Sequence, residues 1–343
     1  MKIESPPGAS LDALTSLRFF AAIAVVFFHV PFVLTKSVGK EQLLGDGALG
    51  VSFFFILSGF ILKHAYSYSE LNFLQFYRKR IFRVLPLHYL TLAIWVLIFF
   101  NGWGNSLQDK LNSGVANILV IHSFFNGQLF NLGFNAVSWS ISVELFFYAI
   151  FPVIRKNQRC LYVFIVYGIV FAVLPKSISD NINTAWPSFF YFNPVSRLFE
   201  FSGGVALYTI YKNITPAKTV ASILQAISVA LLIFSVLATA GFDTHHRNLI
   251  LFFPFSLVIL SFAWDGVLKN VLSIRPLVLL GEASFSLYMI HHMLFRGLDN
   301  YLHMFFSPLQ SLFLAIGVAI VLSVLIFYYF ERPVRMYMST GQA

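Results

Sequence analysis

Arg18 and His29 are two ionisable residues within one long apolar stretch near the start of the chain. They are 11 residues apart, which on an α-helix places both side chains on one face, about 16 Å apart along the axis. A neutral imidazole accepts a hydroxyl proton near pH 7, and a guanidinium binds phosphate through its planar fork of donors. The pair therefore predicts either a catalytic base above an anion-binding group, or an arginine that reaches the membrane surface and a histidine that only packs.

Glu144 is a carboxylate in a later apolar stretch, with Ser140 four residues earlier on the same predicted helix face. A buried carboxylate requires a cation or several hydrogen-bond donors as partners. We therefore expect Glu144 either to orient His29 and stabilise its imidazolium, or to pair with a basic residue. Arg197 and Glu200 are three residues apart, and we interpret them as a structural ion pair on one helix face.

Four basic residues cluster between the second and third apolar stretches: Arg78, Lys79, Arg80 and Arg83. Arginines at this position would suit the phosphates of a ligand. The same cluster would also result if its role were only to attract anionic lipid headgroups. Because the segment 67–86 mixes these charges with aromatic and aliphatic residues, we expect an amphipathic helix lying at the inner membrane interface.

The overall composition indicates an integral membrane protein. Of its 343 residues, 58% are hydrophobic and 11% are charged, with a mean hydropathy of +0.77. A soluble domain carries about 25% charged residues, so a soluble enzyme is excluded, and 41 Phe exclude a disordered chain. The net charge of +9 lies in short segments between apolar runs, which is typical of membrane anchoring rather than nucleic-acid binding. The single cysteine, Cys160, has neither a disulfide partner nor companions for a metal site.

Eleven stretches are candidate spans: 14–34, 47–66, 84–101, 114–126, 138–154, 160–175, 194–212, 219–240, 247–264, 276–296 and 309–330. The segment 114–126 is short for a span, which needs roughly 20 residues. If it does not cross, sixteen Lys and Arg residues lie on the cytoplasmic side and five on the other, as the positive-inside rule requires. We therefore expect an all-α, polytopic helix bundle of about ten spans, with 114–126 re-entrant or peripheral and both termini cytoplasmic.

Seven motifs in order together resemble the membrane acyltransferase-3 family, and they run over residues 14–333. They are Arg18-x10-His29; Gly50-x3-Phe54-Phe-x-Leu-Ser-Gly-Phe60; Arg80-x2-Arg83-x2-Pro86; Ser138-Trp-Ser-x3-Glu144; Arg197-x2-Glu200-x2-Gly203; Ser284-x-Ser-Leu-Tyr-x-Ile-His291; and Phe330-Glu-Arg-Pro333.

The resemblance implies a single integral membrane domain over residues 1–343, without a fused soluble hydrolase-like domain, in a bacterial-type inner membrane. It implies an O-acyltransferase that takes an acyl group, often acetyl, from cytoplasmic acyl-CoA as co-substrate, with no tightly bound cofactor. The acceptor would be a hydroxyl of a surface or exported glycan, such as an exopolysaccharide, a lipopolysaccharide O-antigen or a lipid-linked sugar. Membrane lipids are the other expected partner.

On this interpretation each candidate residue has a role. We expect catalysis by His29 and Glu144, donor binding by Arg18, Arg80 and Arg83, and contacts to substrate or oxyanion by Ser58, Tyr288 and His291. The alternative function is a transporter or flippase of a glycan or lipid-linked intermediate. Broken helices in two related halves would favour a transporter, and the sequence contains no such duplication.

Overall fold

The computed structural model describes residues 11–29, 49–67, 70–99, 106–179, 191–240, 242 and 244–340. Within these ranges the regular structure is helical and no β-strand occurs, which confirms the expected all-α class. In chain order the longer helices are α1 (Asp12–Phe28), α4 (Gly50–Ala65), α5 (Phe73–Phe99), α6 (Leu107–Ile118), α8 (Trp139–Lys156), α9 (Gln158–Ser179), α11 (Leu198–Asn213), α12 (Lys218–Ala238), α13 (Thr244–Ala263), α15 (Arg275–Glu282), α16 (Ser284–Phe305), α17 (Pro308–Ile326) and α18 (Arg332–Thr340). Between them lie α7 (Gln128–Asn131) and α14 (Val267–Leu272).

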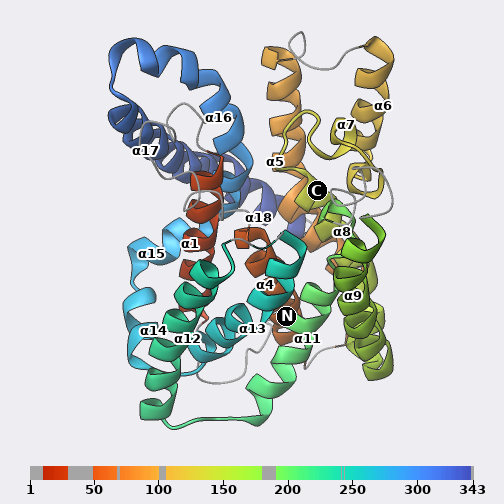
Figure 1. Ribbon diagram of the computed structural model, residues 1–343, viewed down its shortest axis with the longest axis vertical. Coiled ribbons are helices and arrows are strands. Elements are labelled where there is room, and N and C mark those ends of the chain that lie inside the picture. Colours follow the sequence, from red (N-terminus) through yellow and green to blue (C-terminus); the bar gives the residue numbers. More distant parts are fainter. Residues whose placement is uncertain are drawn as a thin grey trace.

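Helix α1 contacts five helices, α4, α13, α14, α15 and α16, and lies beside α15 in Figure 1. Beside it, α4 and α11 pack backbone against backbone. A Cβ added at Gly59 would collide with the carbonyl of Phe201, and one added at Gly204 would collide with the carbonyl of Ile56. Small residues therefore permit this close approach, which fixes α4 next to α11.

Three helices of the described residues are long and apolar enough to cross a membrane: Phe73–Phe99, Lys218–Ala238 and Pro308–Tyr337. A fourth span results if α15 and α16 count as one, although they are bent by 58° relative to each other. The expected single helix over 276–296 is therefore two helices. The bend occurs where Gly281 packs directly on the Thr15 backbone and Ser284 Oγ donates a hydrogen bond to the Gly281 carbonyl at 2.7 Å.

Helix α5 is continuous from Phe73 through Pro86 to Phe99. The segment 67–86, expected to be an amphipathic helix, is helical from Phe73 onward, and its basic residues occupy the first turns of this longer helix. Helix α18 packs along α5. This contact helps to hold the basic end of α5 against the bundle.

The segment 114–126 is not one helix in the structure. Helix α6 ends at Ile118, Val120 has a positive φ of 56°, and a short 3-10 turn follows at His122–Phe124. A β-branched residue rarely adopts this backbone conformation, so Val120 marks a sharp change of direction.

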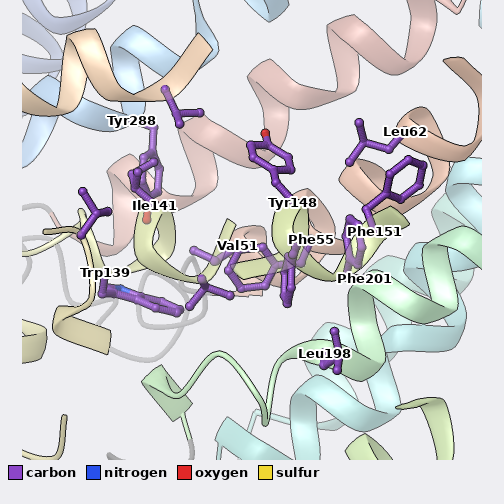
Figure 2. Packing of buried hydrophobic residues seen from close by; sticks show 14 of the residues in the cluster. Val51, Phe55, Leu62, Trp139, Ile141, Tyr148, Phe151, Leu198, Phe201 and Tyr288 are labelled. Atoms are coloured by element: carbon purple, nitrogen blue, oxygen red, sulfur yellow. The ribbon is translucent and has the colours of Figure 1, made fainter. Parts of the chain in front are cut away.

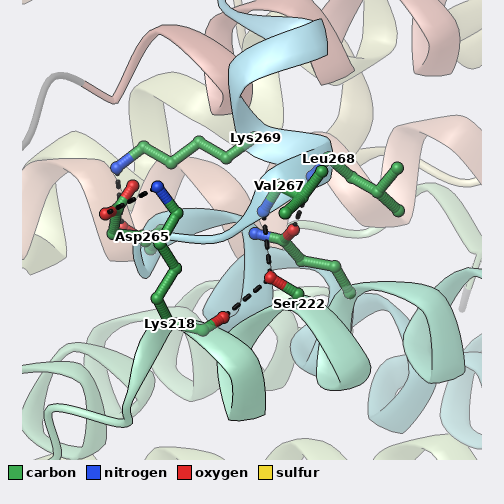
Figure 3. A network of polar contacts seen from close by, with 8 residues as sticks. Lys218, Ser222, Asp265, Val267, Leu268 and Lys269 are labelled. Atoms are coloured by element: carbon green, nitrogen blue, oxygen red, sulfur yellow. Dashed lines mark hydrogen bonds and ion pairs between the residues drawn. The ribbon is translucent and has the colours of Figure 1, made fainter.

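Polar contacts attach α14 to α12 (Figure 3). The backbone N–H of Val267 donates to Ser222 Oγ at 3.0 Å, and the N–H of Leu268 donates to Gln225 Oε1 at 3.0 Å. Helix α14 in turn holds α1, because Ser16 Oγ donates to the Leu272 carbonyl at 2.5 Å. These bonds therefore fix the depth of α1 two residues before Arg18.

Candidate functional site

A cavity of about 270 Å³ lies between α1, α4, α5, α8 and α16. Its lining brings together six side chains that the sequence analysis selected: Arg18, Ser58, Arg80, Arg83, Glu144 and Tyr288. These residues come from five helices. Only the packing of the whole bundle places them around one space.

The cationic part of the lining consists of Arg18 on α1 with Arg80 and Arg83 on α5. Arg80 and Arg83 are one helical turn apart, so both reach the same face of α5. Two carboxylates, Glu144 and Glu331, interact electrostatically with Arg18 and Arg83. With Arg335, which pairs with Glu331, four cations and two anions leave this region with a net positive charge, which favours an anionic ligand.

Glu331 is a buried acid to which the sequence analysis gave no role. It is 3% exposed and ends a π-helical turn, Phe327–Glu331. Ser286 Oγ donates to its Oε2 at 2.6 Å, and Arg335 Nη1 lies 3.5 Å from its Oε1. Glu331 belongs to the motif Phe330-Glu-Arg-Pro333, and this motif could have identified it as a candidate site residue.

Glu144 accepts a hydrogen bond from the hydroxyl of Tyr148, one turn further along α8. Tyr148 is 2% exposed and was also missed from the sequence, although its spacing of four residues from Glu144 is the signal that could have found it. Figure 2 shows Tyr148 within a packed cluster, with its hydroxyl directed away from the rings of Phe151 and Phe201. The ring is thereby fixed while the hydroxyl reaches the carboxylate.

The remaining lining is mostly apolar and comes from α1, α4, α5, α8 and α16: Leu14, Val51, Phe54, Phe55, Leu57, Ile61, Leu62, Val84, Ile141 and Phe285. Such a wall suits an aliphatic chain rather than a second polar group. The cavity lining therefore combines three cationic side chains with a mostly apolar wall.

His29 is not part of this lining, and it contacts His291 and His292 of α16 instead. Its Nδ1 lies 3.0 Å from the Val25 carbonyl oxygen and 3.1 Å from His291 Nε2. Because His291 Nδ1 lies 3.1 Å from the Leu287 carbonyl, that nitrogen carries the His291 proton and Nε2 accepts. The geometry thus assigns the His29 proton to Nδ1 and a lone pair to its Nε2.

The expected contact between Glu144 and His29 is not among the interactions of Glu144 in the described chain, where its hydrogen bond comes from Tyr148. His291, expected to contact substrate or oxyanion, is fully buried and faces His29. Tyr288 is near both groups: it lines the cavity with Glu144, and its ring centroid is 6.0 Å from that of His291.

Two further candidates have defined surroundings. The Tyr288 hydroxyl donates to the Val137 carbonyl at 2.9 Å, so its proton is already engaged and it presents only lone pairs to a ligand. Ser58 lines the cavity from α4.

Arg197 and Glu200 form the ion pair that their spacing predicts, with Arg197 Nε 3.1 Å from Glu200 Oε2. Arg197 Nη2 also donates to Ser52 Oγ at 2.9 Å, and Ser52 Oγ donates to Asn248 Oδ1 at 3.0 Å. This buried network joins α4, α11 and α13 outside the cavity.

Comparison with known proteins gives consistent matches. A family model described as an acyltransferase domain, of the acyltransferase-3 type, matches residues 11–331. The acyltransferase MdmB of Streptomyces mycarofaciens is 30% identical over 85% of this chain and 80% of its own length. The peptidoglycan O-acetyltransferase OatA of Listeria monocytogenes is 23% identical over 95% of the chain, and the O-acetyltransferase OatA of Staphylococcus aureus is equally similar. The chain spans 56–57% of the length of these two OatA proteins. No solved structure matches significantly.

Proposed function

Because the chain belongs to the acyltransferase-3 family, and is thus an enzyme that transfers acyl groups, we propose that it moves an acetyl or other short acyl group from acyl-CoA to a hydroxyl of a surface or exported glycan. The observation that carries this proposal is the cavity, where three arginines and one carboxylate meet an apolar wall. The relative from Listeria monocytogenes is named a peptidoglycan O-acetyltransferase, so a cell-wall glycan is one acceptor of this class.

The donor half of the reaction uses the cationic end. CoA carries phosphates that arginines bind through paired hydrogen bonds, and Arg18, Arg80 and Arg83 lie together there. The acyl-pantetheine arm would extend along the apolar wall. The phosphates would stay on the cytoplasmic side, because phosphates do not enter the hydrocarbon core.

The acceptor half uses His29 as the general base. Its Nε2 would take the proton of the acceptor hydroxyl while the hydroxyl oxygen attacks the thioester carbon. The carbon–sulfur bond then breaks, and the CoA sulfur leaves as a thiol after receiving that proton. His291 keeps Nδ1–H of His29 hydrogen-bonded during this step, and the second oxygen of Glu144 would hold another group of the substrate within the cavity.

Membrane placement follows from the charge asymmetry. We propose an inner-membrane protein of about ten spans, with both termini cytoplasmic and segment 114–126 not crossing. This arrangement puts the basic end of α5 on the side where acyl-CoA is available, and His29 toward the opposite side.

Cysteine labelling checks this topology. Cys160 is first changed to serine, after which Gln158→Cys should react with a membrane-impermeant maleimide only when the cytoplasmic face is accessible. Gln108→Cys, before segment 114–126, is the matched control and should react already on intact cells. Both positions are exposed in the structure. Labelling of position 158 on intact cells would mean that segment 114–126 crosses the membrane.

Mass spectrometry of the surface glycans tests the function itself. Cells with the wild-type protein should carry O-acyl groups that cells lacking it do not. Glu144→Gln keeps the size of the side chain but loses its charge, so we expect acylation to fall by about tenfold or more, the effect of weakening a hydrogen bond to a charged group. Glycans that are identical with and without the protein would refute acyl transfer. A flippase would instead be supported if the glycans are unacylated in both kinds of cell and accumulate inside the cells that lack the protein.

A further inference from the structure

We infer that Tyr148 is a positioning residue for both halves of the proposed reaction: its ring holds the donor arginine Arg80, and its hydroxyl holds Glu144. This inference rests on the function proposed above. It adds a residue that lies outside the cavity lining and assigns separate tasks to two parts of one side chain.

The ring contact is the first observation. The guanidinium carbon of Arg80 lies 6.0 Å from the centre of the Tyr148 ring and 5.8 Å from the centre of the Tyr66 ring. Arg80 thus lies near two tyrosine rings, and aromatic rings attract a cation through their π faces. The rings are themselves fixed, since Tyr66 packs edge-on against Phe76 at 5.3 Å.

The hydrogen bonding of Arg80 indicates the purpose of these two ring contacts. Its Nε is buried and has no hydrogen-bond partner among the described residues, and the side chain lines the cavity. A buried donor without an acceptor is costly, so an anion that enters the cavity would supply the missing acceptor. The two rings hold the guanidinium in place without using any of its N–H groups, which leaves them for the phosphates of the donor.

The hydroxyl contact is the second observation. Tyr148 donates its O–H to Glu144 Oε1, which fixes one carboxylate oxygen and leaves Oε2 for the substrate. Because Tyr148 and Glu144 are one turn apart on α8, the bond also fixes the carboxylate rotamer. Displacement of this side chain would therefore affect donor affinity through Arg80 and turnover through Glu144.

Substitutions separate the two tasks. Tyr148→Phe keeps the ring and removes the hydroxyl, so kcat should fall about tenfold or more while KM for acetyl-CoA stays within about twofold of wild type. Tyr66→Leu removes the other ring near Arg80 and leaves the Tyr148–Glu144 bond in place, so KM for acetyl-CoA should rise about threefold to tenfold at unchanged kcat. Tyr148→Leu should show both effects. Tyr208→Phe is the matched control, because Tyr208 is a buried tyrosine whose hydroxyl bonds Ser67 at 2.8 Å, outside the cavity lining, and it should leave both constants unchanged.

The measurement uses inverted membrane vesicles from cells that produce the protein, with labelled acetyl-CoA added to the exposed cytoplasmic face and label counted in the glycan per molecule of protein. Wild-type kcat in Tyr148→Phe, or wild-type KM in Tyr66→Leu, would overturn the inference while leaving the proposed function intact. Vesicles with wild-type protein that neither bind acetyl-CoA nor transfer label would overturn the proposed function and this inference with it. If Tyr148→Leu does not fold, Tyr148→Phe and Tyr66→Leu still decide whether the inference holds.

Discussion

His29→Ala should abolish glycan acylation while the protein still inserts into the membrane at a normal level. The reason is that His29 is the proposed base, and loss of a general base costs about a hundredfold to ten-thousandfold in rate. Folding should survive, because His29 lies at the end of α1 and its described bonds join it to Val25 and His291. The readout is O-acyl content of the glycan by mass spectrometry, divided by the amount of protein in the membrane.

His64→Ala is the control for this variant. His64 is a histidine near the end of α4 that packs on Phe60 and Tyr208 and does not line the cavity. It should leave acylation unchanged. Full acylation by His29→Ala at normal expression would remove His29 from the mechanism.

Arg83→Ala should weaken the use of acyl-CoA without changing turnover at saturating donor. A lost hydrogen bond from arginine to a phosphate costs about 1.5–3 kcal/mol, which corresponds to a tenfold to hundredfold loss of donor affinity at roughly 1.4 kcal/mol per tenfold. Arg83 lines the cavity beside Arg18 and Arg80, so removal of its charge acts directly on the anion-binding end. The check is titration of acetyl-CoA against purified, correctly folded protein.

Lys79→Ala is the matched control, because Lys79 belongs to the same basic cluster on α5 but does not line the cavity. It should retain wild-type affinity for acetyl-CoA. If the cluster serves only to attract anionic lipid, both variants would insert poorly, yet their correctly inserted molecules would bind acetyl-CoA as well as the wild type does.

The sequence predicted much of the cavity, because charged residues within apolar stretches are costly and therefore conspicuous. Arg18 and Glu144 stood out in this way, and Arg80 and Arg83 stood out as a basic cluster between two apolar stretches. The structure places all four around one space. The ordered motifs indicated the acyltransferase-3 family, and the family match over residues 11–331 confirms that resemblance.

Other features depended on contacts between distant segments and could not be read from the sequence. The bend between α15 and α16 arises where Gly281 meets the backbone of Thr15, a pair separated by most of the chain. The spacing of Tyr148 from Glu144 indicated its hydrogen bond, but its contact with Arg80 of α5 could not be predicted from the sequence. The neighbours of His29 likewise depend on the fold, because α16 places His291 Nε2 3.1 Å from His29 Nδ1.

The most direct test of the central claim is transfer across the membrane by the wild-type protein. Labelled acetyl-CoA is supplied only outside inverted vesicles, so that it meets only their cytoplasmic face, and the enclosed glycan is analysed together with the free CoA that is released. We predict label covalently attached to the enclosed glycan, with one free CoA released outside for each acetyl group transferred, and neither product with His29→Ala. Vesicles that release no CoA and acquire no label, although the wild-type protein is present and folded, would contradict the account.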